Sequence, residues 1–312
     1  MPPHRQTYQD VTFWRGYERF YPPSLRHGDD DPVEQWWRWR DVDVHLDRFP
    51  APDAEATLVL LHGAGGYGRM LAPYARLLRR AESVEVVAPD LPGYGLTRTD
   101  TAVSYPDWLD CVTDLVAAER SRAHRPVFLL GASMGGMLAY QAAARGGVAG
   151  LVVTCLLDPG RPEVRARMTR MPVVGRLGPT VMPRLRRLDR LPVPMGMVAN
   201  MAAMSNEPAL TALVRADRCG GGNRVPLRFL RTFLTGAPPM EPERFTVCPV
   251  LMVHPGADRW TPPEFSVPFF ERIAADTELV ILDRAGHLPI EEPGLTRLGQ
   301  ATGDFVRRHR QG

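Results

Sequence analysis

Apolar residues recur along the chain in short runs of strand length, and most of these runs are continuous rather than alternating. A strand that is apolar on both faces is typical of a parallel sheet covered by helices on both sides. The runs lie at residues 42–49, which alternate, and at 57–61, 84–87, 127–130, 151–156, 250–253 and 278–282. Helical patterns lie between them, at residues 70–81, 105–120, 133–144, 264–275 and 294–308. This alternation predicts an α/β fold, with a mostly parallel central sheet and right-handed crossovers.

One interval interrupts the alternation, because residues 158–246 are far more than a single crossover needs. Prolines divide this interval into short helical pieces. We therefore expect a helical cap inserted at 158–246, and a core domain formed by residues 1–157 and 247–312. Residues 1–40 are rich in tryptophan and are expected to add a leading helix and an edge strand, packed on the core.

The expected cap is rich in methionine and arginine. It holds eight of the 13 methionines: Met168, Met171, Met182, Met195, Met197, Met201, Met204 and Met240. These side chains could pack against one another, or some of them could line an apolar substrate pocket, because the flexible thioether adapts to irregular ligands. A third interpretation is that the basic, apolar cap touches a membrane surface. The sequence leaves all three open.

Composition excludes several classes of function. The chain of 312 residues is 44% hydrophobic and 23% charged and has no apolar run of about 20 residues, so integral membrane association is not expected. The first ten residues lack the apolar segment of a secretory signal, so we expect cytoplasmic residence. Every basic residue is an arginine, which excludes Schiff-base and Ser-Lys chemistry. The arginines are spread among 35 acidic residues, so no nucleic-acid partner is expected. The four cysteines lie far apart, and neither a metal nor a cofactor is predicted.

Candidate chemistry begins at Ser133, in the segment Gly131-Ala132-Ser133-Met134-Gly135 between an apolar run and a helical pattern. A strand that turns into a helix at a single residue strains that residue's backbone, and small neighbours relieve the crowding. The segment therefore predicts a nucleophile elbow, with Ser133 at a helix N-terminus where negative charge is stabilised. The pentapeptide alone is weak evidence, so the rest of the chain must supply the partners of a nucleophile.

The general base is expected to be His287, which follows the apolar run at 278–282. Asp258, in the loop after residues 250–253, is the preferred orienting carboxylate, and Asp158 is its competitor. The alternative role of Asp158 is that of a capping or turn residue before Pro159. The histidines in polar, terminal or loop contexts are interpreted as solvated; these are His4, His27, His45, His124 and His309. His254 is expected to be packed or hydrogen-bonded.

Two backbone N–H groups should stabilise the developing oxyanion, and the sequence predicts those of Met134 and Ala64. Ala64 lies in the glycine-rich turn His62-Gly63-Ala64-Gly65-Gly66, where small residues allow backbone to approach a substrate. A phosphate-binding role for this turn is disfavoured, because its glycine spacing is wrong and no acidic ribose partner is evident. We expect His62 to hold the turn.

Together these residues resemble the α/β-hydrolase superfamily, in particular its lid-bearing esterases, monoacylglycerol lipases and proline iminopeptidases. The resemblance extends from about residue 42 to the end of the chain. Five motifs carry it in the family's order: His62-Gly63, Asp90-Leu91-Pro92-Gly93-Tyr94-Gly95-Leu96-Thr97, Gly131-Ala132-Ser133-Met134-Gly135-Gly136, Gly256-Ala257-Asp258 and Gly286-His287. Serine stands in the elbow where haloalkane dehalogenases and epoxide hydrolases carry aspartate, which argues against both. The Arg- and Met-rich cap matches no subgroup with a known substrate.

The resemblance implies a cofactor-free serine hydrolase with a Ser133-His287-Asp258 triad. Its expected substrate is a small molecule, a carboxylic ester with an apolar acyl or alcohol part, with a thioester or a lactone as variants. The same triad would serve an acyltransferase, a peptidase, a C–C hydrolase or a natural-product tailoring enzyme. A rival from another class is a non-catalytic ligand-binding protein on the same fold. The sequence does not determine the oligomeric state.

Overall fold

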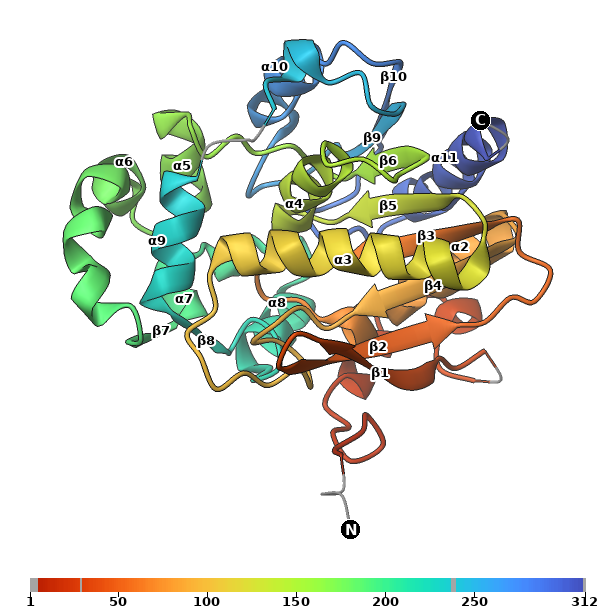
Figure 1. The fold of residues 1–312 in the computed structure, drawn as a ribbon, viewed down its shortest axis with the longest axis horizontal. Helices are drawn as coiled ribbons and strands as arrows, with labels where there is room; N and C mark the ends of the chain where they lie inside the picture. The colour runs from red at the N-terminus through yellow and green to blue at the C-terminus, as the bar shows by residue number, and fades with distance from the viewer. Residues whose placement is uncertain (1–4, 29, 237–239, 311–312) are drawn as a thin grey trace.

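An eight-stranded, mostly parallel sheet forms the centre of the computed structural model, which describes residues 5–28, 30–236 and 240–310 (Figure 1). Across the sheet the strands are β1 (Val33–Trp39), β2 (Val42–Phe49), β4 (Val84–Pro89), β3 (Ala56–Leu61), β5 (Val127–Gly131), β6 (Gly150–Val153), β9 (Val250–Pro255) and β10 (Thr277–Leu282). Only β2 runs antiparallel to its neighbours, β1 and β4. Every residue of β3, β4, β5, β6 and β9 is buried, as expected of parallel strands covered on both faces. The predicted α/β fold is confirmed.

Helices cover both faces of this sheet. On one face α3 (Tyr105–Ala123) packs against α4 (Met134–Ala143), and on the other α2 (Ala72–Ala81) packs against α11 (Gly294–His309) (Figure 1). Ser104 begins α3 with a capping box shared with Asp107, which satisfies backbone donors at the helix start. A 3-10 turn, η2 (Gly68–Leu71), leads into α2. Among the described helices none is both long and apolar enough to cross a bilayer.

The segment between β6 and β9 is inserted into the fold and lies at one end of the sheet (Figure 1). Its elements are α5 (Pro162–Met168), α6 (Pro172–Val181), η3 (Met182–Leu188), β7 (Pro192–Pro194), α7 (Met195–Val198), η4 (Met201–Ala203), α8 (Pro208–Ala216), β8 (Arg224–Pro226), α9 (Leu227–Thr235) and η5 (Pro242–Arg244). Strands β7 and β8 form a separate antiparallel pair. The segment is therefore mainly helical, with a short β ribbon that the proline-rich sequence did not predict.

Two predicted elements differ from the structure. The helix expected at 264–275 is replaced by η6 (Pro263–Phe265) and the short α10 (Val267–Phe270), after which the amides of Arg272 and Ile273 bond three residues back. Pro268 lacks the amide hydrogen that a helix through residues 264–275 would need at this position. The strand expected to reach residue 156 ends at Val153, because the chain then leaves the sheet and the Leu156 N–H donates to the Ser266 hydroxyl.

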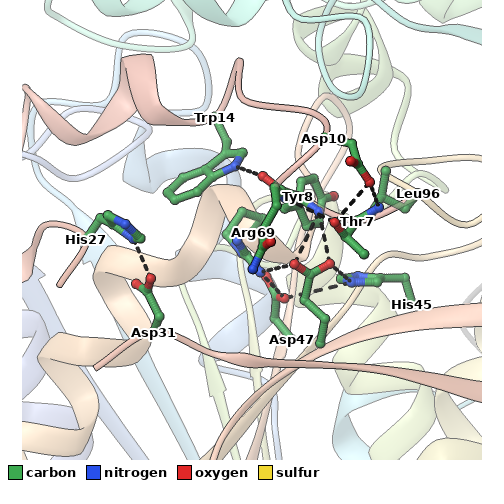
Figure 2. Close-up of polar contacts among 12 residues, drawn as sticks. Thr7, Tyr8, Asp10, Trp14, His27, Asp31, His45, Asp47, Arg69 and Leu96 are labelled. Carbon is green, nitrogen blue, oxygen red and sulfur yellow. Dashed lines mark hydrogen bonds and ion pairs between the residues drawn. The ribbon is translucent and has the colours of Figure 1, made fainter. Parts of the chain in front are cut away.

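The N-terminal residues Tyr8 and Trp14 pack on the core against a buried ion pair between Arg69 and Asp47 (Figure 2). The Arg69 guanidinium donates two hydrogen bonds to Asp47, and it lies over the rings of Tyr8 and Trp14 at 4.7 and 4.9 Å. The Trp14 indole N–H donates to the Tyr8 carbonyl oxygen at 2.9 Å. Of the expected leading helix only one turn forms, α1 (Arg15–Glu18), followed by η1 (Pro23–Leu25) and the edge strand β1.

The sequence predicts a solvated His45, but the structure shows it fully buried on β2. Its Nε2 lies 3.0 Å from Glu34, and its Nδ1 lies 3.2 Å from Asp90 (Figure 2 shows the histidine among its neighbours). Burial alone lowers the pKa of His45, but the charges and contacts of Asp90, Glu34 and Asp47 raise that pKa to about 10. The prediction was wrong because the carboxylates that hold the ring are distant in sequence. His4 lies outside the described residues.

Candidate active site

The turn from β5 into α4 holds Ser133 in a strained backbone conformation, with φ 56° and ψ −126°. A Cβ atom on Gly131 would lie 2.1 Å from the Gly135 carbonyl oxygen, so glycine is required where strand and helix cross most closely. The Ser133 N–H donates to the Thr154 hydroxyl oxygen at 2.9 Å, which ties the elbow to the end of β6. The serine is half-buried at the N-terminus of α4, where the helix favours negative charge.

His287 lies between Ser133 and Asp258 in a single hydrogen-bonded chain. Its Nε2 is 2.8 Å from the Ser133 Oγ, and its Nδ1 is 2.7 Å from the Asp258 Oδ2. The three residues come from loops that follow β5, β9 and β10, whose carboxyl ends meet at one edge of the sheet. This geometry lets the imidazole accept the Ser133 proton at one nitrogen while the carboxylate holds the proton on the other.

The Asp258 carboxylate is buried and accepts three further hydrogen bonds. The Trp260 and Thr261 amides donate to Oδ1 at 2.7 and 2.9 Å, and the Thr261 hydroxyl donates to Oδ2 at 2.9 Å. Burial alone would raise the pKa of Asp258, but the charge and hydrogen bond of His287 and the Thr261 donors hold that pKa well below its usual value. Asp258 is therefore ionised at neutral pH.

Asp158, the competing carboxylate, does not join this chain. Its Oδ1 accepts the Gly160 N–H at 2.7 Å, which closes a local turn after Leu157. His62 also has a structural role: Nδ1 contacts the Gly63 carbonyl oxygen at 2.9 Å, and Nε2 accepts the Leu91 N–H at 3.0 Å. Burial lowers the pKa of His62 to about 4, which keeps its ring neutral. His254 is buried, with Nδ1 3.0 Å from the Pro255 carbonyl oxygen.

The glycine-rich turn after β3 lies directly against the elbow. A Cβ atom on Gly63 would lie 2.8 Å from the Ala132 carbonyl oxygen and 3.0 Å from the Met134 nitrogen, so only glycine allows this approach. Ala64 lines one cavity together with Ser133 and His287. Met134 begins α4, so its N–H is one of the helix donors that lack an intrahelical partner. Ala64 thus lines the cavity at Ser133, and Met134 directly follows the serine; their role as oxyanion donors stays a prediction.

Two apolar cavities meet at Ser133. The first, here called the core cavity, is lined by Ala64, Met70, Tyr74, Met204 and Leu298, among others, and includes His287. The second, the insertion cavity, is lined among others by Met168, Met195, Leu230, Phe233 and Trp260. The methionines divide accordingly: Met168, Met195 and Met204 line the cavities, whereas Met171 and Met197 are exposed on the surface.

Comparison with known protein families identifies the family of this chain. The model of the alpha/beta hydrolase family matches residues 58–296, about three quarters of the chain. The chain belongs to the alpha/beta hydrolase family. No curated protein matches the sequence significantly.

Solved structures share this hydrolase fold at low identity. A soluble variant of monoglyceride lipase from Saccharomyces cerevisiae, in complex with a substrate analogue, is 16% identical, with a TM-score of 0.73 over 93% of this chain and 99% of that one. The monoacylglycerol lipase of Paleococcus ferrophilus is 21% identical, with a TM-score of 0.67 over 85% and 99%. A thermophilic esterase from Thermogutta terrifontis is 20% identical, with a TM-score of 0.60 over 89% and 99%.

Several side chains that contact the candidate site were not singled out in the sequence. Thr154, Thr261 and Trp260 position the elbow and the carboxylate, and the Trp260 ring lies 4.7 Å from the His287 ring. The sequence could have pointed to two of them by position, because Thr154 directly follows β6 and Thr261 lies three residues after Asp258.

Asp90, from the motif at residues 90–97, has a structural role: its carboxylate accepts hydrogen bonds from the Tyr8 hydroxyl and from the Gly68 and Leu96 amides. Within the described ranges no group of three or more His, Cys, Asp or Glu could hold a metal ion.

Proposed function

We propose that this protein is a serine hydrolase that cleaves a carboxylic ester with two apolar parts. The observation that carries the proposal is the hydrogen-bonded chain from Ser133 through His287 to the buried Asp258, at the junction of two apolar cavities. An ester carbonyl at Ser133 would extend one arm into each cavity. A thioester or a lactone would fit the same arrangement.

The proposed reaction has two halves. In the first, His287 Nε2 takes the Ser133 proton as Oγ attacks the carbonyl carbon, and the Ala64 and Met134 N–H groups bind the oxyanion. The imidazolium then gives its proton to the departing alcohol, leaving an acyl-enzyme. In the second half water attacks this acyl group, His287 again takes the proton, and the acid leaves as Ser133 regains its hydrogen.

We further propose that residues 158–246 act as a cap on a core formed by residues 1–157 and 247–312, with residues 1–40 as an extension of that core. The support is that Met168, Met195 and Phe233 from the insertion form one wall of the cavity at Ser133. The cap would exclude water from the site and select the substrate's apolar part. Cytoplasmic residence stays a prediction.

The test combines labelling with turnover. A fluorophosphonate probe should label the folded protein at Ser133 alone, and Ser133→Ala should abolish labelling and lower hydrolysis of p-nitrophenyl butyrate at least about a thousandfold. A series of p-nitrophenyl esters should show a kcat/KM that rises from acetate to longer acyl chains, because each buried methylene contributes about 0.8 kcal/mol. Retention of activity by Ser133→Ala would refute the mechanism. Absence of labelling and turnover in the folded protein would favour a ligand-binding role instead.

A further inference from the structure

The insertion exposes a concentration of large apolar side chains. Of the 13 large hydrophobic residues that are exposed in the described chain, eight lie within one stretch of 27 positions: Met171, Val173, Val174, Leu177, Val181, Leu188, Leu191 and Met197. Single exposed apolar residues are normal on a protein surface, but a contiguous group marks an interaction site. We call residues 170–197 the apolar–basic face.

In helix α6 of this face the small residues are buried and large apolar residues are exposed, which is the reverse of an ordinary surface helix. Its small residues point inward: Gly175 and Gly178 are buried, and a Cβ atom on Gly175 would lie 2.3 Å from the Arg165 carbonyl oxygen. Val173 and Leu177, one turn apart, point outward and are 60% and 55% exposed. A surface helix normally buries its large apolar side chains against the core. The outward surface of α6 is therefore apolar although α5 and α9 already cover its inner side.

Positive charge surrounds these apolar side chains. Between positions 170 and 191 there are six arginines, at 170, 176, 184, 186, 187 and 190, and a single acidic residue, Asp189. Asp189 accepts hydrogen bonds from Arg231 of α9. Arg176, Arg187 and Arg190 are exposed and form no ion pair with any residue that the structure describes. The face thus carries an excess of uncompensated positive charge.

We propose that the apolar–basic face docks on an anionic lipid surface. The valines, leucines and methionines would enter the boundary between headgroups and acyl chains, and the arginines would contact lipid phosphates. A second copy of the chain is disfavoured as the partner, because a symmetric dimer through this face would oppose two arginine clusters. An anionic lipid surface would supply the negative charge that balances the arginines of the face.

The position of the face connects this docking to the cavity. Met168, Met195 and Val198, which line the insertion cavity, belong to the same stretch of chain or lie next to it. An apolar molecule leaving the lipid would therefore meet the part of the protein that covers Ser133. Docking itself does not depend on the proposed hydrolysis, so Ser133→Ala should bind lipid as the wild type does.

The test is flotation of the full chain with vesicles of phosphatidylcholine and phosphatidylglycerol at 1:1, and with vesicles of phosphatidylcholine alone. We expect binding to the first at about 0.1 M NaCl, weaker binding to the second, and release at high salt. Arg186→Gln combined with Arg187→Gln should weaken binding about 25-fold, at about fivefold for each arginine. Val173→Ser combined with Leu177→Ser should weaken it at least about tenfold, because both side chains would leave the lipid.

Matched controls separate the face from general charge and hydropathy. Arg215→Gln with Arg297→Gln removes two exposed arginines that form no ion pair within the described parts of the chain. Phe13→Ser with Val247→Ser removes two exposed apolar side chains at 41% and 39% exposure. Neither pair should change flotation. Equal loss in control and test pairs, or no binding to the anionic vesicles, would overturn the proposal. It would also be overturned if the wild type formed a dimer that Val173→Ser with Leu177→Ser separated, without any lipid binding.

Discussion

Replacing Asp258 with asparagine should invert the hydrogen bonding of the triad without disturbing its packing. Asparagine has the shape of aspartate, but one of its two terminal atoms is an NH2 donor. The Oδ1 position faces two backbone donors, the amides of Trp260 and Thr261 at 2.7 and 2.9 Å, which cannot reorient. The amide oxygen must therefore occupy that position, and the NH2 group must face His287.

The substitution would affect Ser133 by changing which nitrogen of the His287 imidazole carries the proton. An NH2 group 2.7 Å from Nδ1 makes that nitrogen an acceptor, so the single proton of neutral His287 moves to Nε2. The Nε2–H then points at the Ser133 Oγ, 2.8 Å away, and cannot accept its proton. The Thr261 hydroxyl can rotate and accept from the new NH2 group, so no buried polar atom is left unpaired.

We expect Asp258→Asn to lower kcat on p-nitrophenyl butyrate about 10⁴-fold, or about 5.5 kcal/mol of barrier, as wrong-tautomer substitutions do in serine triads. Its unfolding midpoint in urea should remain near that of the wild type. Asp158→Asn is the matched control, because that carboxylate serves only a local turn, and its kcat should stay within about twofold. A loss below tenfold in Asp258→Asn, or an equal loss in Asp158→Asn, would refute this reasoning.

Three further changes test other parts of the structure. Thr154→Val leaves the Ser133 N–H without its acceptor and should lower the free energy of unfolding by about 1–3 kcal/mol, measured in urea. His45 has its folded pKa raised to about 10, so its stabilising contribution is complete below its unfolded pKa of about 6.5 and is lost as pH rises toward 10. Between pH 6.5 and 8.0 the wild type should therefore lose about 1.5 kcal/mol of stability relative to His45→Gln, and parallel curves would contradict the buried charge. Met168→Trp should fill the insertion cavity and lower kcat/KM for long-chain esters about tenfold more than for the acetate, and a uniform change would argue against that cavity as a substrate site.

The central strands of the sheet could be predicted from the sequence because they are buried on both faces. A continuous apolar run such as 127–130 needs no information from distant residues, and it became β5. The elbow was predictable for a related reason, since Gly131 relieves crowding within its own turn. By contrast, the helix expected at 264–275 did not form, because its apolar spacing took no account of Pro268, which cannot donate a backbone hydrogen bond.

What the sequence could not predict depends on groups brought together from distant positions. His45 reads as a polar residue on an alternating strand, yet Glu34 and Asp90 make it a buried, charged one. The methionines of the insertion show the same limit, because Met195 and Met197 are two positions apart while one lines a cavity and the other is 63% exposed. The sequence shows that the insertion is rich in methionine, but only the packed structure shows which methionines line a cavity and which lie on the surface.

The insertion and the glycine-rich turn that contains Ala64 are also linked, through contacts that neither segment reveals alone. A Cβ atom on Gly220 would lie 2.5 Å from the Gly65 carbonyl oxygen, so the insertion packs directly on the turn that contains Ala64. Asp217, just before this contact, accepts hydrogen bonds from the hydroxyls of Tyr17 and Tyr67, each at 2.8 Å. The N-terminal residues therefore hold the insertion against the turn. Because Ala64 is the proposed oxyanion donor, the position of the insertion and the geometry of the proposed oxyanion site depend on the same contacts.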